Sequence, residues 1–262
     1  MMRRERAPIW IAVLAAIGAA FFVLPLVGLV VRAPWGDALR SLTSPDTLEA
    51  LKLSLIASLS STGVSLVLGV PLAWVYARIE FPGRTVLRAL TTLPMVLPPV
   101  VGGIALLLAF GRRGLLGSWL ATTFGITLPF TTAGVVFAET FVAMPFLVLT
   151  VEGGLRSMDR RYEDAARTLG ARRWTVFTRV TLPLIAPSLF AGAVLCWARA
   201  LGEFGATITF AGNFPGVTQT MPLAVYLLLE TNPDGSFILS LILLLVSLVF
   251  LVVLRHRWLG SA

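Results

Sequence analysis

The sequence predicts an all-α integral membrane protein with six transmembrane helices and both chain termini in the cytoplasm. Of its 262 residues, 57% are hydrophobic and 13% are charged, and the mean hydropathy is +0.88. A soluble domain of this length would be far less apolar. In addition, the apolar residues are grouped into long stretches, and most basic residues lie between these stretches.

Six stretches approach or exceed the roughly 20 apolar residues that a helix needs to cross a bilayer. The first follows a basic leader, but it is about 23 residues long, whereas the apolar part of a secretory signal has roughly 7 to 15. We therefore interpret it as a retained span. No soluble domain fits between the spans, so residues 1–262 are predicted to form one transmembrane domain. The predicted spans are 9–31, 53–76, 87–110, 130–150, 184–210 and 237–254.

The basic residues of the connections set the orientation, because cytoplasmic loops carry an excess of Lys and Arg. With the N-terminus inside, the inner set has fifteen members and the outer set five, while Arg199 lies within the fifth span. Both termini are therefore predicted to be cytoplasmic. The inner set is Arg3, Arg4, Arg6, Arg78, Arg84, Arg88, Arg156, Arg160, Arg161, Arg167, Arg172, Arg173, Arg179, Arg255 and Arg257; the outer set is Arg32, Arg40, Lys52, Arg112 and Arg113.

The composition argues against several other classes of protein. Cys196 is the only cysteine and His256 the only histidine, so neither a disulfide within the chain nor a Cys or His metal site is expected. The G-x-x-x-x-G-K-[ST] run of nucleotide-binding loops is absent from the sequence. The net charge of +8 is explained by cytoplasmic loops and does not indicate nucleic acid. We expect no enzymatic activity, cofactor or metal on this chain.

The longest inner connection, at about 151–183, has the pattern of a helix, a turn and a second helix. Tyr162, Ala165, Ala166 and Leu169 recur at the spacing of one helix face. Gly170 follows directly, as expected where a helix ends in a residue with positive φ. The small residues of this face would let a partner surface approach closely. An amphipathic helix on the lipid headgroups would have a similar pattern, so the pattern alone leaves both interpretations open.

This connection resembles the cytoplasmic loop of the permease subunits of bacterial ABC importers. That family carries Glu-Ala-Ala, three residues, Gly, nine residues, Ile, one residue and Leu-Pro before its penultimate span. Here the run is Asp164-Ala165-Ala166, then Gly170, Val180 and Leu182-Pro183 at the same spacing. The resemblance implies a six-helix permease fold and a separate ATPase that binds ATP and Mg²⁺. The residues implied to couple the chain to that ATPase are Glu163, Asp164, Ala165, Ala166, Leu169 and Gly170.

Two groups of residues inside the predicted spans are candidates for the translocation path or its gate. Arg199 and Glu203 are four residues apart, so they can pair on one helix face. The pair either locks helix packing or holds Arg199 beside a path for an anion. Pro94, Pro98 and Pro99 are expected to kink the third span, either at a gate or as a fixed bend. Glu139, another acid within a span, is given no role.

Several runs are similar to the molybdate branch of the same permease family. They are ARALGEFGAT at 198–207, FAGNFPGVTQT at 210–220, PLAVY at 222–226, LPMVLPP at 93–99 and GRRGLLG at 111–117. Sulfate permeases share looser forms of these runs. The resemblance implies a multi-pass subunit in the cytoplasmic (inner) membrane of a bacterium or archaeon. Its expected function is to translocate molybdate or tungstate by alternating access.

The resemblance also implies a set of partners. These are a second copy of the chain in a homodimer, two ATPase subunits, an extracytoplasmic oxyanion-binding protein and the lipid bilayer, with no nucleic acid. Two other functions stay open. One is a permease for sulfate, thiosulfate or another oxyanion. The other is a stand-alone secondary transporter, in which Glu139 and Glu203 would carry protons, although the spans show no inverted repeat.

Overall fold

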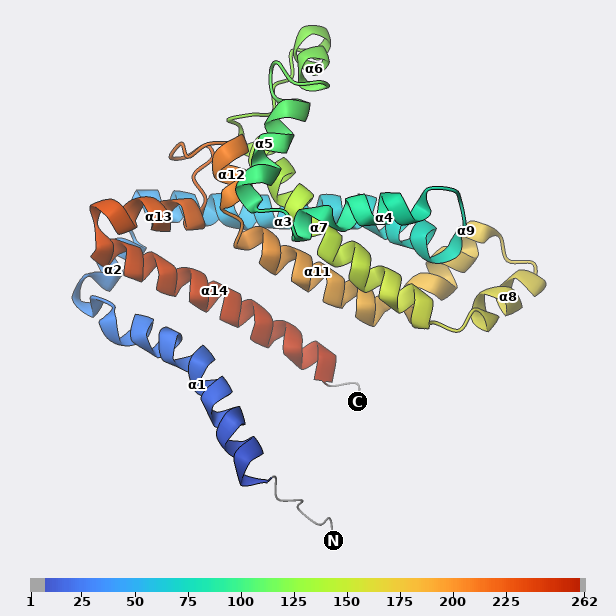
Figure 1. Ribbon diagram of the computed structural model, residues 1–262, viewed down its shortest axis with the longest axis horizontal. Helices are drawn as coiled ribbons and strands as arrows, with labels where there is room; N and C mark the ends of the chain where they lie inside the picture. The colour runs from blue at the N-terminus through green and yellow to red at the C-terminus, as the bar shows by residue number, and fades with distance from the viewer. Residues whose placement is uncertain (1–7, 260–262) are drawn as a thin grey trace.

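The computed structural model describes residues 8–259, without the side chains of 251 and 253–259, and this part of the chain contains helices and turns but no strand (Figure 1). The elements are α1 Ile9–Arg32, η1 Trp35–Asp37, α2 Ala38–Leu42, α3 Pro45–Arg78, α4 Arg84–Thr92, η2 Leu93–Met95, α5 Pro99–Phe110, α6 Gly117–Phe124, α7 Thr132–Ser157, α8 Arg161–Thr168, α9 Arg173–Val176, the π-helix η3 Phe177–Thr181, α10 Leu182–Leu184, α11 Ala186–Leu201, α12 Gly205–Phe210, α13 Met221–Thr231 and α14 Pro233–Leu259.

Helix α3 is the longest element, and its buried face is lined with small residues. Ser44 caps its start by accepting a hydrogen bond from the Thr47 amide, and Pro45 occupies the first turn. Every fourth residue from 57 to 77 is Ala, Ser or Gly and is buried against α7 or α11. Small residues at this spacing let two helix backbones approach closely within a membrane. These buried small residues are Ala57, Ser61, Ser65, Gly69, Ala73 and Ala77.

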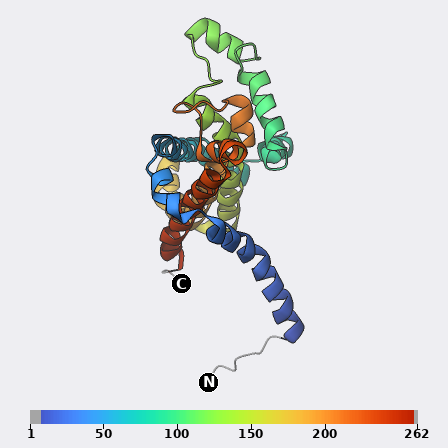
Figure 2. The ribbon, with the colours of Figure 1, turned by 90° about the vertical axis from the view of Figure 1, so that its left-hand side faces the viewer.

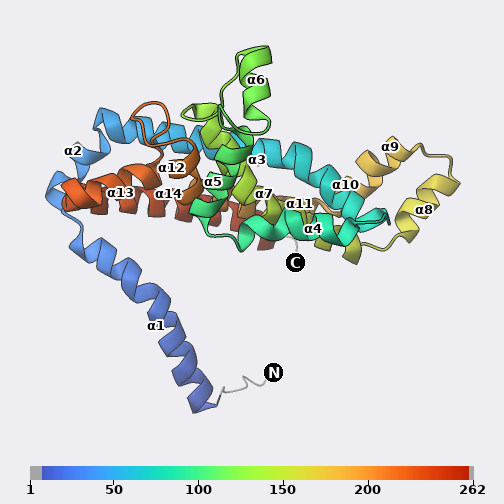
Figure 3. The ribbon, with the colours of Figure 1, turned by 45° about the horizontal axis from the view of Figure 1, so that its top comes forward.

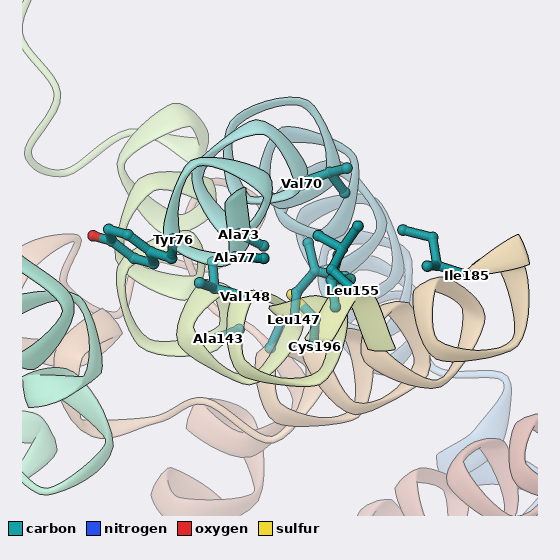
Figure 4. Close-up of a cluster of buried hydrophobic side chains, with 12 residues drawn as sticks. Val70, Ala73, Tyr76, Ala77, Ala143, Leu147, Val148, Leu155, Ile185 and Cys196 are labelled. Atoms are coloured by element: carbon teal, nitrogen blue, oxygen red, sulfur yellow. The ribbon is translucent and has the colours of Figure 1, made fainter. Parts of the chain in front are cut away.

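The main core lies where α3, α7 and α11 pack together (Figure 4). Leu147, Val148 and Leu155 of α7 are at most 1% exposed and fill the space beside the small residues of α3. A Cβ atom built on Gly69 would lie 3.1 Å from Leu147 Cδ2. Larger residues on α3 would therefore push α7 away, which explains why the sequence places its bulky apolar side chains on α7.

Four predicted spans are continuous helices, and two are not. Spans 9–31, 53–76 and 237–254 lie within α1, α3 and α14, and span 130–150 lies within α7 except for its first two residues. These four helices are long and apolar enough to cross a membrane, and up to six spans result if each of two bent helix pairs counts as one. The prediction of an α-helical membrane protein is thus confirmed, whereas a count of six depends on the bent pairs.

The span predicted over 87–110 is broken at the prolines that were expected to kink it. The segments 84–95 and 99–110 meet at an angle of 119°, because Pro94 lies in the short η2 turn and Pro98 and Pro99 begin α5. Proline has no amide hydrogen to donate, so three prolines within six residues end one helix and start another. The end of α5 and helix α6 consequently project away from the other helices (Figure 1), while the start of α5 packs against α12.

The predicted span 184–210 is also divided. Its apolar part is α11 and the short α12, separated at residues 202–204, and α11 is bent by 73° relative to the preceding segment 173–184. Likewise, the inner connection predicted at 151–183 begins later, because α7 continues to Ser157. The coupling segment proper is therefore 158–184, with α8 as its first helix.

The inner connections that the structure describes lie at one end of the molecule. The end of α3, the start of α4 and the helices α8 and α9 gather at one end, while α2, α13 and the start of α14 lie at the other (Figures 1 and 3). The arginine-rich connections predicted to be cytoplasmic thus lie together. Arg3, Arg4 and Arg6 fall outside the described residues, as do the side chains of Arg255 and Arg257, so the predicted location of the termini stays a prediction.

Helix α1 stands apart from the other helices (Figure 2). It contains no buried residue, and apolar side chains such as Phe21 and Phe22 are each 74% exposed. Among the described helices it packs mainly against α14. Such a helix requires lipid or another protein surface around it.

Candidate functional site

The coupling segment contains the predicted helix and turn. Helix α8 spans Arg161–Thr168, and Gly170 has φ +84°. The amide of Gly170 donates to the Arg167 carbonyl (2.9 Å), and the amide of Ala171 donates to the Ala166 carbonyl (3.0 Å). This closes the helix end with a residue in the left-handed region, where glycine is favoured. The predicted helix and its glycine turn are confirmed.

The small face of α8 is accessible on the surface of the chain. Tyr162 is 58% exposed and Leu169 is 87% exposed; Ala165 is exposed and Ala166 is partly exposed. Asp164 is exposed beside them and pairs with Arg167 at 3.1 Å. Apolar residues at the tip of an otherwise charged segment form a surface that a partner can cover, with charges around its edge.

Glu163 differs from the other predicted coupling residues, because it points into the molecule. Its side chain is 4% exposed and lies 3.2 Å from Arg78 Nε, itself 8% exposed. The Thr181 hydroxyl donates to its Oε1 (2.7 Å). Glu163, implied by the resemblance to be a coupling residue, is therefore not part of the exposed face of α8; it joins α8 to the end of α3 and to η3.

A second buried carboxylate, Glu152, holds the same end of the molecule together. Its Oε1 lies 2.7 Å from Arg156 Nη2, and its Oε2 lies 3.0 Å from Arg88 Nε. Arg156 also donates to the Tyr76 carbonyl, and Arg160 to the Ala77 carbonyl, closing the end of α3. These contacts were not predicted from the sequence, although Glu152 lies four residues before Arg156, a spacing at which side chains can pair on one helix face.

The predicted pairing of Arg199 with Glu203 is confirmed. Arg199 Nη2 lies 2.6 Å from Glu203 Oε2, with the Glu203 side chain 1% exposed and that of Arg199 26% exposed. The pair does not lie on one continuous helix, because α11 ends at Leu201. Glu203 Oε1 accepts a hydrogen bond from the Ala206 amide (2.7 Å) and so caps α12. Glu203 therefore joins the two halves of the broken span.

The break before α5, at the prolines, lies next to the break between α11 and α12, at Glu203. A Cβ atom on Gly205 would lie 2.7 Å from Pro99 Cβ, and one on Gly103 would lie 2.6 Å from Thr209 Cβ. Helices α5 and α12 therefore cross in close contact, which only glycine permits at these two positions. Pro99 is brought to the α12 crossing, whereas Pro94 and Pro98 lie before it in the chain.

Glu139 on α7 is 1% exposed, and its Oε2 has no hydrogen-bond partner among the described residues. No group of three or more His, Cys, Asp or Glu side chains in that part of the chain is arranged to hold a metal ion.

Known proteins share both the sequence and the fold. The chain is 50% identical over 242 residues to the "Molybdenum transport system permease protein ModB" of Mycobacterium tuberculosis, covering 92% of this chain and 90% of that protein. It is 39% identical over 226 residues to the "Sulfate transport system permease protein CysT" of Escherichia coli, covering 84% and 81%. A bacterial ABC transporter involved in alginate import has a similar fold, with a TM-score of 0.74 at 20% identity over 95% of this chain and 94% of that chain.

The family model described as "Binding-protein-dependent transport system inner membrane component" matches residues 65–260, which include the coupling segment and both breaks. The chain belongs to this family of transport-system membrane components.

Proposed function

We propose that the chain is the membrane-spanning subunit of an ATP-driven importer of molybdate, with tungstate as a second substrate. The observation that carries the proposal is the exposed α8 face with its Gly170 turn, in a chain 50% identical to a molybdenum permease. This subunit supplies the path, and a separate ATPase binds ATP and Mg²⁺. No cofactor is assigned to this chain.

The contacts of α8 suggest how the ATPase moves the spans. A partner covering Tyr162, Ala165 and Leu169 displaces α8 when the ATPase closes. Glu163 ties α8 to Arg78 of α3 and to Thr181 of η3. Displacement of α8 is thereby transmitted to α3 and, through η3 and α10, to α11. These helices pack with α7 into one block, and tilting this block opens the path alternately to each side.

Arg199 is the residue proposed to meet the oxyanion. About a quarter of its side chain is exposed, while Glu203 is buried behind it. Glu203 fixes the guanidinium and partly neutralises it, which keeps anion binding reversible. Pro94, Pro98 and Pro99 are proposed to let α5 move against α4 as the gate opens, since the break between these helices lacks continuous backbone hydrogen bonds.

The exposed apolar surface supports an assembly of several chains within the bilayer. Helix α1 is unburied, and Val96 and Leu108 near the proline break are 84% and 69% exposed. We propose that a second copy covers part of this surface in a homodimer, with lipid around the rest. Two ATPase subunits then bind the two α8 surfaces, and an extracytoplasmic binding protein delivers the oxyanion. The host is a bacterium or archaeon with the chain in its cytoplasmic membrane.

Uptake into sealed vesicles tests the proposed class of transporter. Vesicles containing this chain, its ATPase and its binding protein are loaded with ATP and given labelled molybdate. We expect uptake to require ATP and to persist when an ionophore collapses the ion gradients. Uptake that survives ATP removal but stops with the gradients would instead indicate a secondary transporter.

Sulfate is the second candidate substrate, because the chain is 39% identical to a sulfate permease. Sulfate, molybdate and tungstate are all tetrahedral dianions, so a path lined by one arginine does not by itself distinguish them.

A further inference from the structure

A pocket rich in arginine lies at the end of the molecule that carries the coupling segment. It encloses about 360 Å³ between the end of α3, the start of α4 and the end of α7, which is within the size range of small-molecule sites. It is separate from the Arg199–Glu203 pair. The pocket is lined by Ala77, Arg78, Glu80, Arg84, Arg156 and Arg160.

Three of the four arginines are fixed in place by the protein. Arg78 is paired with Glu163 and Arg156 with Glu152, while Arg160 donates one bond to the Ala77 carbonyl. Each guanidinium has five N–H donors. These contacts therefore orient the guanidinium groups and leave other N–H donors available to bind a ligand. The pocket is therefore preorganised, which lowers the entropy cost of binding a ligand.

Arg84 has no such partner. It is half-buried, and its guanidinium makes no hydrogen bond or ion pair with any residue that the structure describes, whereas its amide donates to the Phe81 carbonyl (3.3 Å). It is the first residue of α4, a nine-residue helix whose N-cap is Gly83 and whose first turn holds no acid. The N-terminus of α4 thus adds partial positive charge at the position of Arg84. Glu80, the one carboxylate of the lining, is exposed.

We infer that this pocket binds a tetrahedral oxyanion, in the form of a lipid phosphate group or a free cytoplasmic anion. Guanidinium groups bind phosphate-like oxyanions through paired hydrogen bonds. Arg84 and Arg160 supply the donors that carry no carboxylate partner, and Arg78 and Arg156 shape the walls. A bound anion would join α3, α4 and α7 beside α8, so its occupancy would stiffen the segment that moves with the ATPase.

The test uses the assembled permease and ATPase in nanodiscs, with two arms that separate the sources of the anion. In the first arm, the lipid is a galactolipid that carries no phosphate, and inorganic phosphate is titrated at constant ionic strength. In the second, phosphatidylglycerol replaces part of the lipid, phosphate is absent, and retained lipid is counted by native mass spectrometry. Arg84→Gln is the main variant, since Arg84 has no polar partner whose loss would disturb folding. Arg179→Gln is the matched control, because Arg179 is exposed and outside the pocket.

We expect Arg84→Gln to weaken binding about 10- to 100-fold in one arm, the effect of losing a hydrogen bond to a charged group. Arg84→Lys should retain part of the binding, and Arg179→Gln should match the wild type. A difference in the phosphate arm identifies a free oxyanion, and a difference only in the lipid arm identifies a headgroup. If Arg84→Gln matches the wild type in both arms, the pocket is not an oxyanion site.

Discussion

The buried pair of Arg78 and Glu163 allows a quantitative test of how α8 is held. The side chains are 8% and 4% exposed, so Arg78→Met leaves the Glu163 carboxylate buried without its counter-charge. Breaking a buried pair in this way costs about 3–5 kcal/mol. Because 1.4 kcal/mol is a factor of ten, the equilibrium for detaching α8 should shift by about 100-fold or more. Replacing both residues should remove most of this penalty.

The double variant Arg78→Met/Glu163→Met isolates the charge effect from the loss of packing. It leaves the Thr181 hydroxyl without its acceptor, which costs about 1–3 kcal/mol; adding Thr181→Val should recover that part too. Hydrogen exchange of the α8 amides in the assembled transporter reports the detachment. Of these three variants, Arg78→Met should exchange fastest, the double variant more slowly, and the triple variant slowest. Equal exchange in Arg78→Met and the wild type would refute this role of the pair.

Three further changes test the turn, the span break and the helix crossing. Gly170→Val places a β-branched residue at φ +84°, with about 1–3 kcal/mol of strain, so ATP hydrolysis should uncouple from uptake; Gly170→Asn should be milder, and normal coupled transport by the valine variant would contradict the role of the turn. Arg199→Gln should reduce uptake and assembly more than Arg199→Gln/Glu203→Gln, because the single change leaves Glu203 buried and unpaired; equal losses would argue against the pair. Gly205→Ala should lower the melting temperature, since its Cβ would lie 2.7 Å from Pro99 Cβ, whereas the matched Gly153→Ala has open space; equal melting temperatures would show that α12 can shift freely.

Features set by local chemistry were predictable from the sequence. Gly170 follows a helical run, and a helix commonly ends in a glycine with positive φ. Arg199 and Glu203 are four residues apart and were expected to pair, which they do. The four continuous spans follow from their apolar length alone.

Features that depend on distant residues were not predictable in the same way. The prolines at 94, 98 and 99 indicate a kink, but the 119° angle also depends on where α12 crosses α5 at Gly103 and Gly205. Glu163 and Asp164 are neighbouring acids, yet Glu163 is buried and Asp164 is exposed. The difference arises because Glu163 pairs with Arg78, which lies 85 positions earlier in the chain. Helical period cannot reveal such a partner.

Competition for uptake tests the proposed substrate most directly. Vesicles with this chain, its ATPase and its binding protein take up labelled molybdate in the presence of unlabelled molybdate, tungstate or sulfate. If the chain serves a molybdate importer, molybdate and tungstate should suppress uptake at similar concentrations, while sulfate should suppress it only in large excess. Sulfate competing as well as molybdate, together with ATP-dependent uptake of labelled sulfate, would contradict the assignment.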